Sequence, residues 1–282
     1  MKGEEMKHDL FSESLRYSPC SYGKSKVLFR GPKRKLSEPY VAFIGGTETY
    51  GKFIIRPFPN LVEDSLRATC VNFGCINGGV DAYVNDPELM SFCREAKATV
   101  VQVMGANFLS NRFYSVHPRR NDRFLGASSV LKAIYNEVDF SKFSFTRHML
   151  SELYELSPDR FDIVVAELRE AWEARMRSML TYIGPNNVVL WFARTNMSDR
   201  PWQLRDQPLQ CDPLFITKQM IERLGPLTKR VISVVPSEFA TNQGTQGMHF
   251  TFSQSHAASE MLSVASHHEV SQALVPELRS FF

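Results

Sequence analysis

Five short apolar segments, separated by helix-like patterns, are the feature that most constrains how this chain can fold. They span residues 41–44, 68–73, 99–104, 187–192 and 230–235, and each is unalternating and contains Val or Ile. Strands that are covered on both faces have this character, whereas half-exposed strands alternate. Strands that alternate with helices indicate right-handed crossovers and a parallel sheet. We therefore predict an α/β fold, a three-layer α/β/α sandwich with about five parallel strands.

Three of the intervening segments carry the signals of helix ends. A capping side chain followed directly by proline stands at Asp86, Ser157 and Asp212. Glycines that favour a helix end follow the second and third of these segments at Gly184 and Gly225. These residues predict helices that begin at each cap, because such side chains satisfy free N–H groups and proline suits the first helical position.

Length and charge limit the organisation of the chain and its partners. The 282 residues, 43% of them hydrophobic, suffice for one large core. We predict a single α/β domain over residues 39–282, with the polar residues 1–38 as an N-terminal extension that lies over it. The net charge of +3 is small for this size. A nucleic-acid partner is therefore not expected.

The cysteines and the apolar segments bear on location. The five cysteines show neither CxxC nor any other metal-ligand spacing, so we expect buried thiols in a reducing compartment, with no metal and no cofactor. The amino terminus is charged, and no segment reaches the roughly 18 apolar residues of a membrane span. We therefore expect a cytoplasmic protein without a membrane span. The sequence does not decide the oligomeric state.

Glycines and polar residues follow the predicted strands, where ligand sites of parallel sheets lie. The first strand runs into Gly46, Thr47 and Glu48, in the stretch "YVAFIGGTETYGKF". Thr47 there is consistent with a nucleophile, a phosphate-binding loop or a tight turn. Phe53 stands where a phosphate-binding loop needs a hydroxyl side chain, which disfavours a nucleotide site. Gly78 and Gly79 follow the second strand and Asn107 the third.

The order of these blocks resembles the SGNH or GDSL-like hydrolase superfamily over residues 41–262. The stretches Gly45-Gly46-Thr47, Gly78 or Gly79, Gly105-Ala106-Asn107 and Gln246-Gly247-Met248-His249 stand in that order. The chain is also similar to a group of bacterial proteins that share "GGTETYGKF" and "SNRFYSVHPRRNDRF". The superfamily resemblance implies an SGNH-hydrolase-like, flavodoxin-like fold.

The resemblance also implies roles for individual residues. Thr47 stands in the position of the nucleophilic serine, His249 in that of the base, and Gln246 in that of the acid that orients the base. The N–H of Thr47, the N–H of Gly78 or Gly79 and the Asn107 amide would stabilise an oxyanion. A glutamine cannot stabilise an imidazolium by charge, and losing that charge lowers the rate by orders of magnitude.

A cluster of basic residues follows Asn107 in the sequence. Arg112, His117, Arg119 and Arg120 lie within nine positions. Arginine binds phosphate, sulfate or carboxylate with two parallel hydrogen bonds, so this arginine loop could hold an anionic substrate. Arg147 could join it from a helix. The alternative is that these arginines form surface ion pairs.

The sequence thus predicts a divergent SGNH-like hydrolase, or an acyl or group transferase, acting on an ester of an anionic or carbohydrate-linked small-molecule substrate. The alternatives are a catalytically degenerate binding protein for an anionic metabolite or glycan, and a sulfotransferase-like enzyme. His256, His267 and His268 lie in the terminal helical region, and we expect them at the surface.

Overall fold

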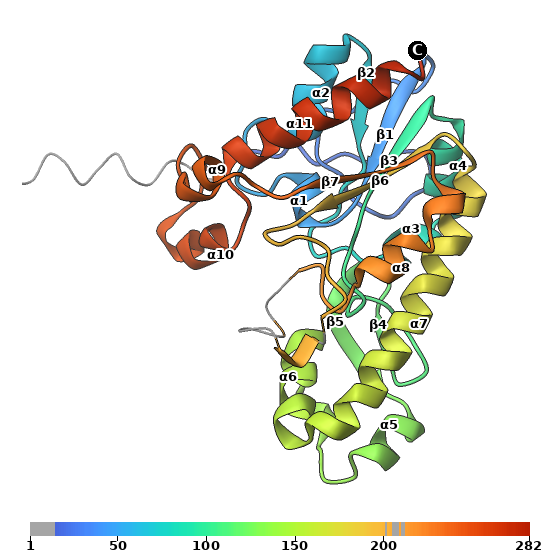
Figure 1. Cartoon of the computed structure of the whole chain (residues 1–282), viewed down its shortest axis with the longest axis vertical. Helices are drawn as coiled ribbons and strands as arrows, with labels where there is room; N and C mark the ends of the chain where they lie inside the picture. The colour runs from blue at the N-terminus through green and yellow to red at the C-terminus, as the bar shows by residue number, and fades with distance from the viewer. Residues whose placement is uncertain (1–14, 201, 205–208, 210–211) are drawn as a thin grey trace, which may run out of the picture.

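A five-stranded parallel sheet forms the centre of the molecule (Figure 1). The structure, a computed structural model, describes residues 15–200, 202–204, 209 and 212–282. The order across the sheet is β2-β1-β3-β6-β7. The strands are β1 (Tyr40–Ile44), β2 (Thr69–Asn72), β3 (Ala98–Gln102), β6 (Asn187–Phe192) and β7 (Arg230–Val234). This order of strands is flavodoxin-like. The predicted three-layer sandwich is confirmed, with every strand at its predicted segment.

The central strands are buried along their whole length. Every residue of β1, β3 and β6 is buried, as their unbroken apolar sequences require. β1 lies between two parallel neighbours, so Ala42 is in register with Val71 on one side and Thr99 on the other. The carboxyl ends of β1 and β3 therefore meet at one edge of the sheet.

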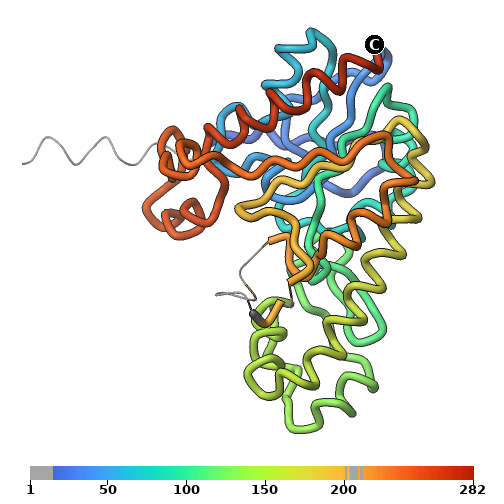
Figure 2. Tube along the Cα trace, in the orientation of Figure 1, coloured from blue at the N-terminus to red at the C-terminus, as the bar shows by residue number. Residues whose placement is uncertain are grey.

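Helices cover both faces of the sheet. On one face α2 (Phe58–Leu66) and α11 (Val264–Arg279) enclose a core that includes Phe43 and Val270. On the other, α4 (Pro87–Glu95) and α7 (Pro158–Ile183) enclose a larger core that includes Trp172. Figure 2 shows α11 crossing the sheet region while the long α7 runs down its other side. The other α-helices of the described residues are α1 (Thr47–Tyr50), α3 (Asp81–Val84), α5 (Ser129–Ile134), α6 (Thr146–Leu156), α8 (Lys218–Glu222), α9 (Glu238–Asn242) and α10 (Ser255–Ser259).

Two of the three predicted helix starts are confirmed. The side chain of Asp86 caps α4, and that of Ser157 caps α7, which ends at Ile183 with Gly184 as its C-cap. The third was wrong, because the side chain of Thr217 caps α8 and Asp212 lies well before it. The Asp212 carboxylate instead binds Arg147, so its capping capacity is used in a contact between distant segments.

A hairpin and two helices extend the molecule below the sheet. β4 (Tyr114–His117) and β5 (Arg120–Ala127) pair antiparallel, and with α5, α6 and the first turns of α7 they form what we call the hairpin lobe (Figure 1). This hairpin corrects the expectation of a loop here. Val116 and Phe124 are buried, but the charged residues of the turn separate them in the sequence. These charges hide the alternation of apolar and polar residues that marks a strand.

The segment before β1 is packed onto the domain. Tyr22 and Phe29 are buried and contact the ring of Phe73. The buried guanidinium of Arg30 donates hydrogen bonds to four backbone carbonyls, those of Tyr50, Gly51, Ile54 and Ile55. Residues 15–39 thus help to close the core and brace the segment that follows α1. Residues 1–14 of the predicted extension lie outside the described residues.

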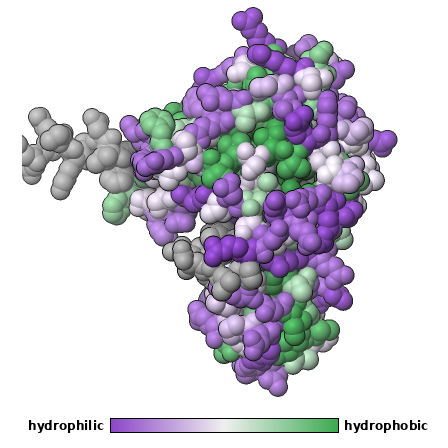
Figure 3. Space-filling view, viewed as in Figure 1, coloured by the Kyte–Doolittle hydropathy of each residue, from purple (hydrophilic) through white to green (hydrophobic). Residues whose placement is uncertain are grey.

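The cysteines that the structure describes are free thiols, three of them buried. Cys70, Cys75 and Cys93 are buried free thiols, Cys20 is half-buried, and Cys211 lies outside the described residues. Within the described ranges, no helix has the length and apolar character needed to cross a bilayer. The face shown in Figure 3 is largely hydrophilic, with hydrophobic residues gathered over the sheet and near the lower end.

Candidate active site

A cavity of about 790 Å³ opens at the carboxyl edge of the sheet. Its lining comes from residues at or after the ends of β1, β2, β3 and β6, from the hairpin lobe, and from the loops at residues 212–213 and 259–262. The lining is Gly46–Glu48, Asn77, Gly78, Gln102–Gly105, Phe108, Asp122, Phe145–Arg147, Phe192–Thr195, Asp212, Pro213 and Ser259–Leu262. Its position agrees with the rule that parallel sheets bind ligands beyond the carboxyl ends of their strands.

The turn after β1 is held by a side chain from β3. The Gln102 amide oxygen accepts hydrogen bonds from the N–H of Gly46 at 3.2 Å and from the N–H and hydroxyl of Thr49 at 3.1 and 2.5 Å. A Cβ on Gly45 would contact Thr49 and lie 2.6 Å from the Cβ of Gln102, so only glycine fits there. The turn is therefore rigid and presents Thr47 and Glu48 to the cavity.

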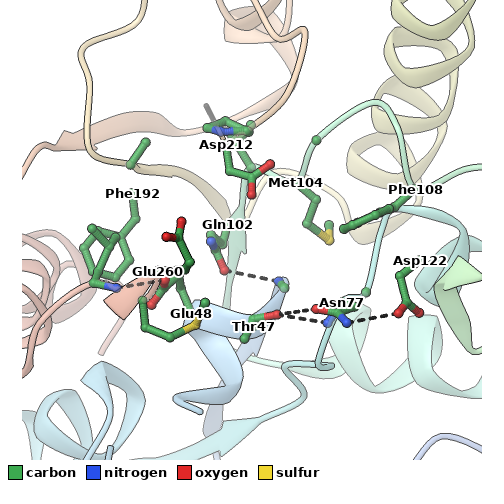
Figure 4. A pocket seen from close by; sticks show the side chains of 18 of the residues that line it. Thr47, Glu48, Asn77, Gln102, Met104, Phe108, Asp122, Phe192, Asp212 and Glu260 are labelled. Carbon is green, nitrogen blue, oxygen red and sulfur yellow. Dashed lines mark hydrogen bonds between the residues drawn. The ribbon is translucent and has the colours of Figure 1, made fainter. Parts of the chain in front are cut away.

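Thr47 is joined to the hairpin lobe by one asparagine. Its hydroxyl donates to Asn77 Oδ1 at 3.2 Å and accepts from the Asn77 N–H at 2.9 Å. Asn77 Nδ2 donates to Asp122 Oδ2 at 3.1 Å, which completes the chain in Figure 4. Asn77 has φ +53, a left-handed conformation that asparagine adopts more readily than most residues. The Thr47 hydroxyl thus bonds to an amide and not to a basic group.

The charged side chains of the lining are mostly acidic. Four carboxylates and two guanidinium groups line the cavity, a net formal charge of −2: Glu48, Asp122, Asp212, Glu260, Arg147 and Arg194. Arg194 Nη2 already donates to the carbonyls of Ser259 and Met261 at 2.9 and 3.0 Å. The field in the cavity therefore favours neutral or cationic groups over anions.

Arg147 and Asp212 form the ion pair of the cavity wall. Arg147 Nη2 lies 2.9 and 3.0 Å from the two Asp212 oxygens, and Nη1 donates to the Leu209 carbonyl at 2.7 Å. Enclosure by the protein raises the pKa of Asp212 above its ordinary value, which Arg147 opposes and the nearby Glu48 carboxylate reinforces. The Asp212 side chain is nevertheless 64% exposed, because it faces the open cavity. Solvent in the cavity therefore weakens this effect.

Glu48 lies between the cavity and the core. Its Oε1 accepts from the Leu262 N–H at 3.1 Å, and its Oε2 lies 3.5 Å from Nε2 of His267. His267 is fully buried, which corrects the expectation that it lies at the surface. It occupies the inner face of α11, where it packs between Phe58 and Phe192.

Two of the donors expected for an oxyanion site, the N–H groups of Gly78 and Gly79, bond within the protein. The Gly78 N–H donates to the Cys75 carbonyl at 3.0 Å, and the Gly79 N–H donates to Asn121 Oδ1 at 2.8 Å. Asn107 is fully buried, and neither its Nδ2 nor its Oδ1 has a hydrogen-bond partner. Of these, Gly78 lines the cavity, whereas Gly79 and Asn107 do not. Thr47, whose N–H is the remaining expected donor, also lines the cavity.

The expected base and its partner also lie apart from the lining. The N–H of His249 donates to the Phe53 carbonyl at 2.8 Å, and its side chain is half-buried outside the cavity lining. Gln246 is exposed in the turn before it. Met248, buried between them, anchors this segment to a small cluster with Phe53. Packing of the segment onto the residues after α1 keeps His249 out of the lining.

The basic residues of the arginine loop lie outside the cavity lining. Arg112 pairs with Glu167 and Glu170 of α7. His117 Nδ1 accepts from the N–H groups of Arg119 and Arg120 at 3.2 Å and so closes the turn between β4 and β5. None of these four basic residues is among the cavity lining. The arginine that does reach the cavity from the hairpin lobe is Arg147.

Several lining residues were missed in the sequence. Gln102 was hidden inside an apolar strand, although a glutamine at the end of a buried strand is itself a signal, because it must find partners. Asp212 was interpreted as a helix cap, and Glu260 and Arg194 lie in loops without a motif. Across the described ranges, no three His, Cys, Asp or Glu side chains gather as a metal site would require.

Comparisons with known proteins give a family and distant likenesses to solved structures. A family profile described as "Domain of unknown function (DUF6473)" matches residues 4–282. No curated protein matches the chain. Among solved structures, the crystal structure of the lipase Lip_vut3 from a goat rumen metagenome matches with 11% identity and a TM-score of 0.40, covering 84% of this chain and 98% of that one. The family match spans every residue of the cavity lining.

Proposed function

We propose that this chain, which belongs to the DUF6473 family, is a hydrolase or group transferase whose cavity accepts a neutral, carbohydrate-linked ester. The observation that carries the proposal is the net negative charge of the lining, which holds four carboxylates and only two arginines among its described residues. Hydroxyl groups of a sugar donate well to carboxylate oxygens, and such bonds are stronger than those between neutral groups. A phosphate or sulfate would instead meet a negative field.

Both arginines of the lining are engaged by the protein. Arg147 binds both oxygens of Asp212, and Arg194 binds two carbonyls. An anionic ligand would have to displace these partners before either guanidinium could bind it with two hydrogen bonds. Of the two substrate classes that the sequence suggested, the carbohydrate-linked class is therefore favoured over the anionic one.

Apolar side chains of the lining suit the faces of a sugar ring. Met104, Phe108, Phe145 and Phe192 line the cavity together with the polar groups. Small-molecule sites commonly combine such apolar walls with a few placed polar groups. The cavity volume of about 790 Å³ lies within the range of roughly 300–1,000 Å³ that is usual for such sites.

The proposed chemistry is hydrolysis in which a carboxylate activates water. Thr47 and Gly78 lie in the cavity, as a relation to the SGNH hydrolases would have them, and this relation remains part of the proposal. The Thr47 hydroxyl donates to an amide oxygen, which does not activate it as a nucleophile. We therefore assign Thr47 to substrate contact and the attack on the acyl carbon to water.

A binding protein without catalysis is the second candidate. It is favoured by one observation, that no histidine is among the described residues of the lining. Ester hydrolysis by the purified protein separates the two candidates, because a binding protein would be stabilised by the sugar without releasing the acid.

The test compares one sugar in three forms. O-acetylated glucose, its 6-phosphate and its 6-sulfate are offered to the wild type, and acetate release and the melting temperature are measured. We expect release from the neutral ester, and less release and less stabilisation with the two anionic forms. Glu48→Gln should abolish release, whereas Glu238→Gln, on an exposed helix outside the cavity, should not change it. Preference for the phosphate or sulfate ester would contradict the proposal.

A further inference from the structure

A buried histidine lies directly behind the part of the cavity wall that Glu48 forms. His267 is fully buried, and its Nδ1 accepts a hydrogen bond from the Phe58 N–H at 3.1 Å. An imidazole nitrogen that accepts carries no proton, so the neutral ring has its proton on Nε2. Phe58 stacks on the ring with centroids 5.7 Å apart, and Phe192 packs edge-on at 5.3 Å. The direction of the Nε2–H bond is therefore fixed.

A carboxylate oxygen of Glu48 lies close to this Nε2. Nε2 of His267 lies 3.5 Å from Oε2 of Glu48 and has no hydrogen-bond partner. N–H···O hydrogen bonds span about 2.7–3.2 Å, so a movement of a few tenths of an ångström by the Glu48 side chain would form one. Hydrogen bonds of catalytic groups are often long without substrate and shorten when it binds. A buried donor with no other acceptor favours that movement.

The other oxygen of Glu48 is held from a different element. Oε1 accepts from the N–H of Leu262, in the loop before α11, at 3.1 Å. The side chain is 17% exposed, and this exposure is toward the cavity that it lines. One donor, the Leu262 N–H, thus holds the carboxylate, while the buried His267 Nε2 faces its other oxygen at 3.5 Å.

The other three carboxylates of the lining are placed differently. Asp122 accepts from Asn77, and Asp212 is bound by Arg147. Glu260 is exposed on the loop after α10. Among the described residues of the lining, Glu48 is the carboxylate that faces a buried imidazole, and it follows Thr47 directly in the chain.

Building on the proposed function, we propose that Glu48 is the general base of the cavity and that His267 is the positioning residue that holds it. Glu48 takes a proton from water while the water oxygen forms a bond to the acyl carbon of the ester. The bond from this carbon to the sugar oxygen then breaks, and protonated Glu48 returns its proton to that oxygen. Ester and water give acid and alcohol, and both side chains end in their starting states.

Two substitutions of His267 by an amide side chain distinguish a role in positioning Glu48 from a role in packing alone. In His267→Asn the short amide oxygen can replace Nδ1 as the acceptor for the Phe58 N–H, but nothing reaches Glu48. In His267→Gln the longer amide can place a donor near the position of Nε2, but the Phe58 N–H loses its acceptor. Rates are measured on 4-nitrophenyl acetate and O-acetylated glucose, and melting temperatures on the same preparations.

We expect the two His267 variants to rank in opposite orders by kcat and by melting temperature. Glu48→Gln should lower kcat by about 10²-fold or more, the usual contribution of a general base. His267→Asn should lower kcat by about 10- to 100-fold with KM nearly unchanged, because small misplacements of a catalytic group have effects of this size. His267→Gln should recover most of that rate while melting at a lower temperature than His267→Asn.

Three results would overturn the inference, and they are distinguishable. If the wild type releases no acid from either ester, the proposed function fails and the inference fails with it. If the wild type is active and Glu48→Gln retains its kcat, Glu48 is not the base. If the rates of the two His267 variants merely follow their melting temperatures, His267 is only a packing residue, although the proposed function stands.

Discussion

The amide oxygen of Gln102 lies 2.5 Å from the hydroxyl of Thr49, so the end of β3 holds the turn that follows β1. The same oxygen accepts from the N–H groups of Gly46 and Thr49. Gln102 is 6% exposed, which means that water cannot replace it. The geometry of Thr47 and Glu48 thus depends on a side chain from the neighbouring strand.

Gln102→Met tests this dependence. Methionine keeps the volume but offers no comparable acceptor, so we expect the free energy of unfolding to fall by about 1–3 kcal/mol, the cost of leaving a buried polar group unpaired. Denaturant unfolding measures this change. Gln272→Met, on the exposed side of α11, is the matched control and should have almost no effect. Equal stability of the two variants would show that the turn does not need Gln102.

Gly45→Ala tests the packing of the same turn. The added Cβ would lie 2.6 Å from the Cβ of Gln102 and would also contact Thr49. Overpacking of this kind costs about 1–3 kcal/mol, so we expect a clear fall in melting temperature. Gly126→Ala, in β5, meets no atom within 4 Å and is the control. A Gly45→Ala protein as stable as this control would mean that β1 and β3 can move apart.

The sheet could be predicted from the sequence because its signal is local. Strands buried on both faces need continuous apolar runs, and each of the five runs became a strand of the sheet. The hairpin formed by β4 and β5 was missed, since its turn is rich in charged residues. The elements that it packs against, in the hairpin lobe, come later in the chain. Asp212 was misassigned because proline after aspartate is found in turns as well as at helix starts.

The site was predicted only where it follows the strands. Gly46, Thr47, Glu48 and Gly78 reach the cavity because the sheet brings the ends of its strands together. Arg112 does not, because its partner Glu167 lies 55 positions away on α7 and no local pattern could reveal it. Side chains that meet across distant elements are decided by tertiary packing. His267, behind Glu48, belongs to this class.

Arg30 offers a test of the segment that precedes β1. Its guanidinium is buried and donates to four carbonyls next to α1. Burial lowers the pKa of Arg30, so these acceptors must offset the cost of enclosing a cation.

Arg30→Leu should therefore lower the free energy of unfolding by more than about 3 kcal/mol, since single hydrogen bonds to charged groups contribute about 1.5–3 kcal/mol. Lys35→Leu also removes one positive charge, but from an exposed position, and should leave stability nearly unchanged. Chemical denaturation of both variants measures the difference. If both behave as the wild type does, residues 15–39 contribute little to the stability of the domain.

The carboxylates of two ion pairs, Arg147–Asp212 and Arg160–Glu137, should contribute to stability with opposite dependence on pH. The pKa of Asp212 is raised, chiefly by enclosure in the protein, so folding favours its protonated form. Its contribution to stability is present below the unfolded pKa and is lost as pH rises through the folded pKa. The pKa of Glu137 is lowered, chiefly by its hydrogen bond to Arg160. Its contribution is present above the unfolded pKa and is lost as pH falls through the folded pKa.

Asp212→Asn should accordingly be at least as stable as the wild type at pH 7, and the difference should shrink as the wild-type carboxyl becomes protonated in acid. Glu137→Gln should be less stable than the wild type at pH 7 and should approach it in acid. Both effects will be small, because Asp212 faces the solvent of the cavity and Glu137 the outer surface. Melting temperatures from pH 7 to pH 3 measure both. A destabilised Asp212→Asn protein at pH 7 would mean that the attraction of Arg147 outweighs the cost of enclosing the carboxylate.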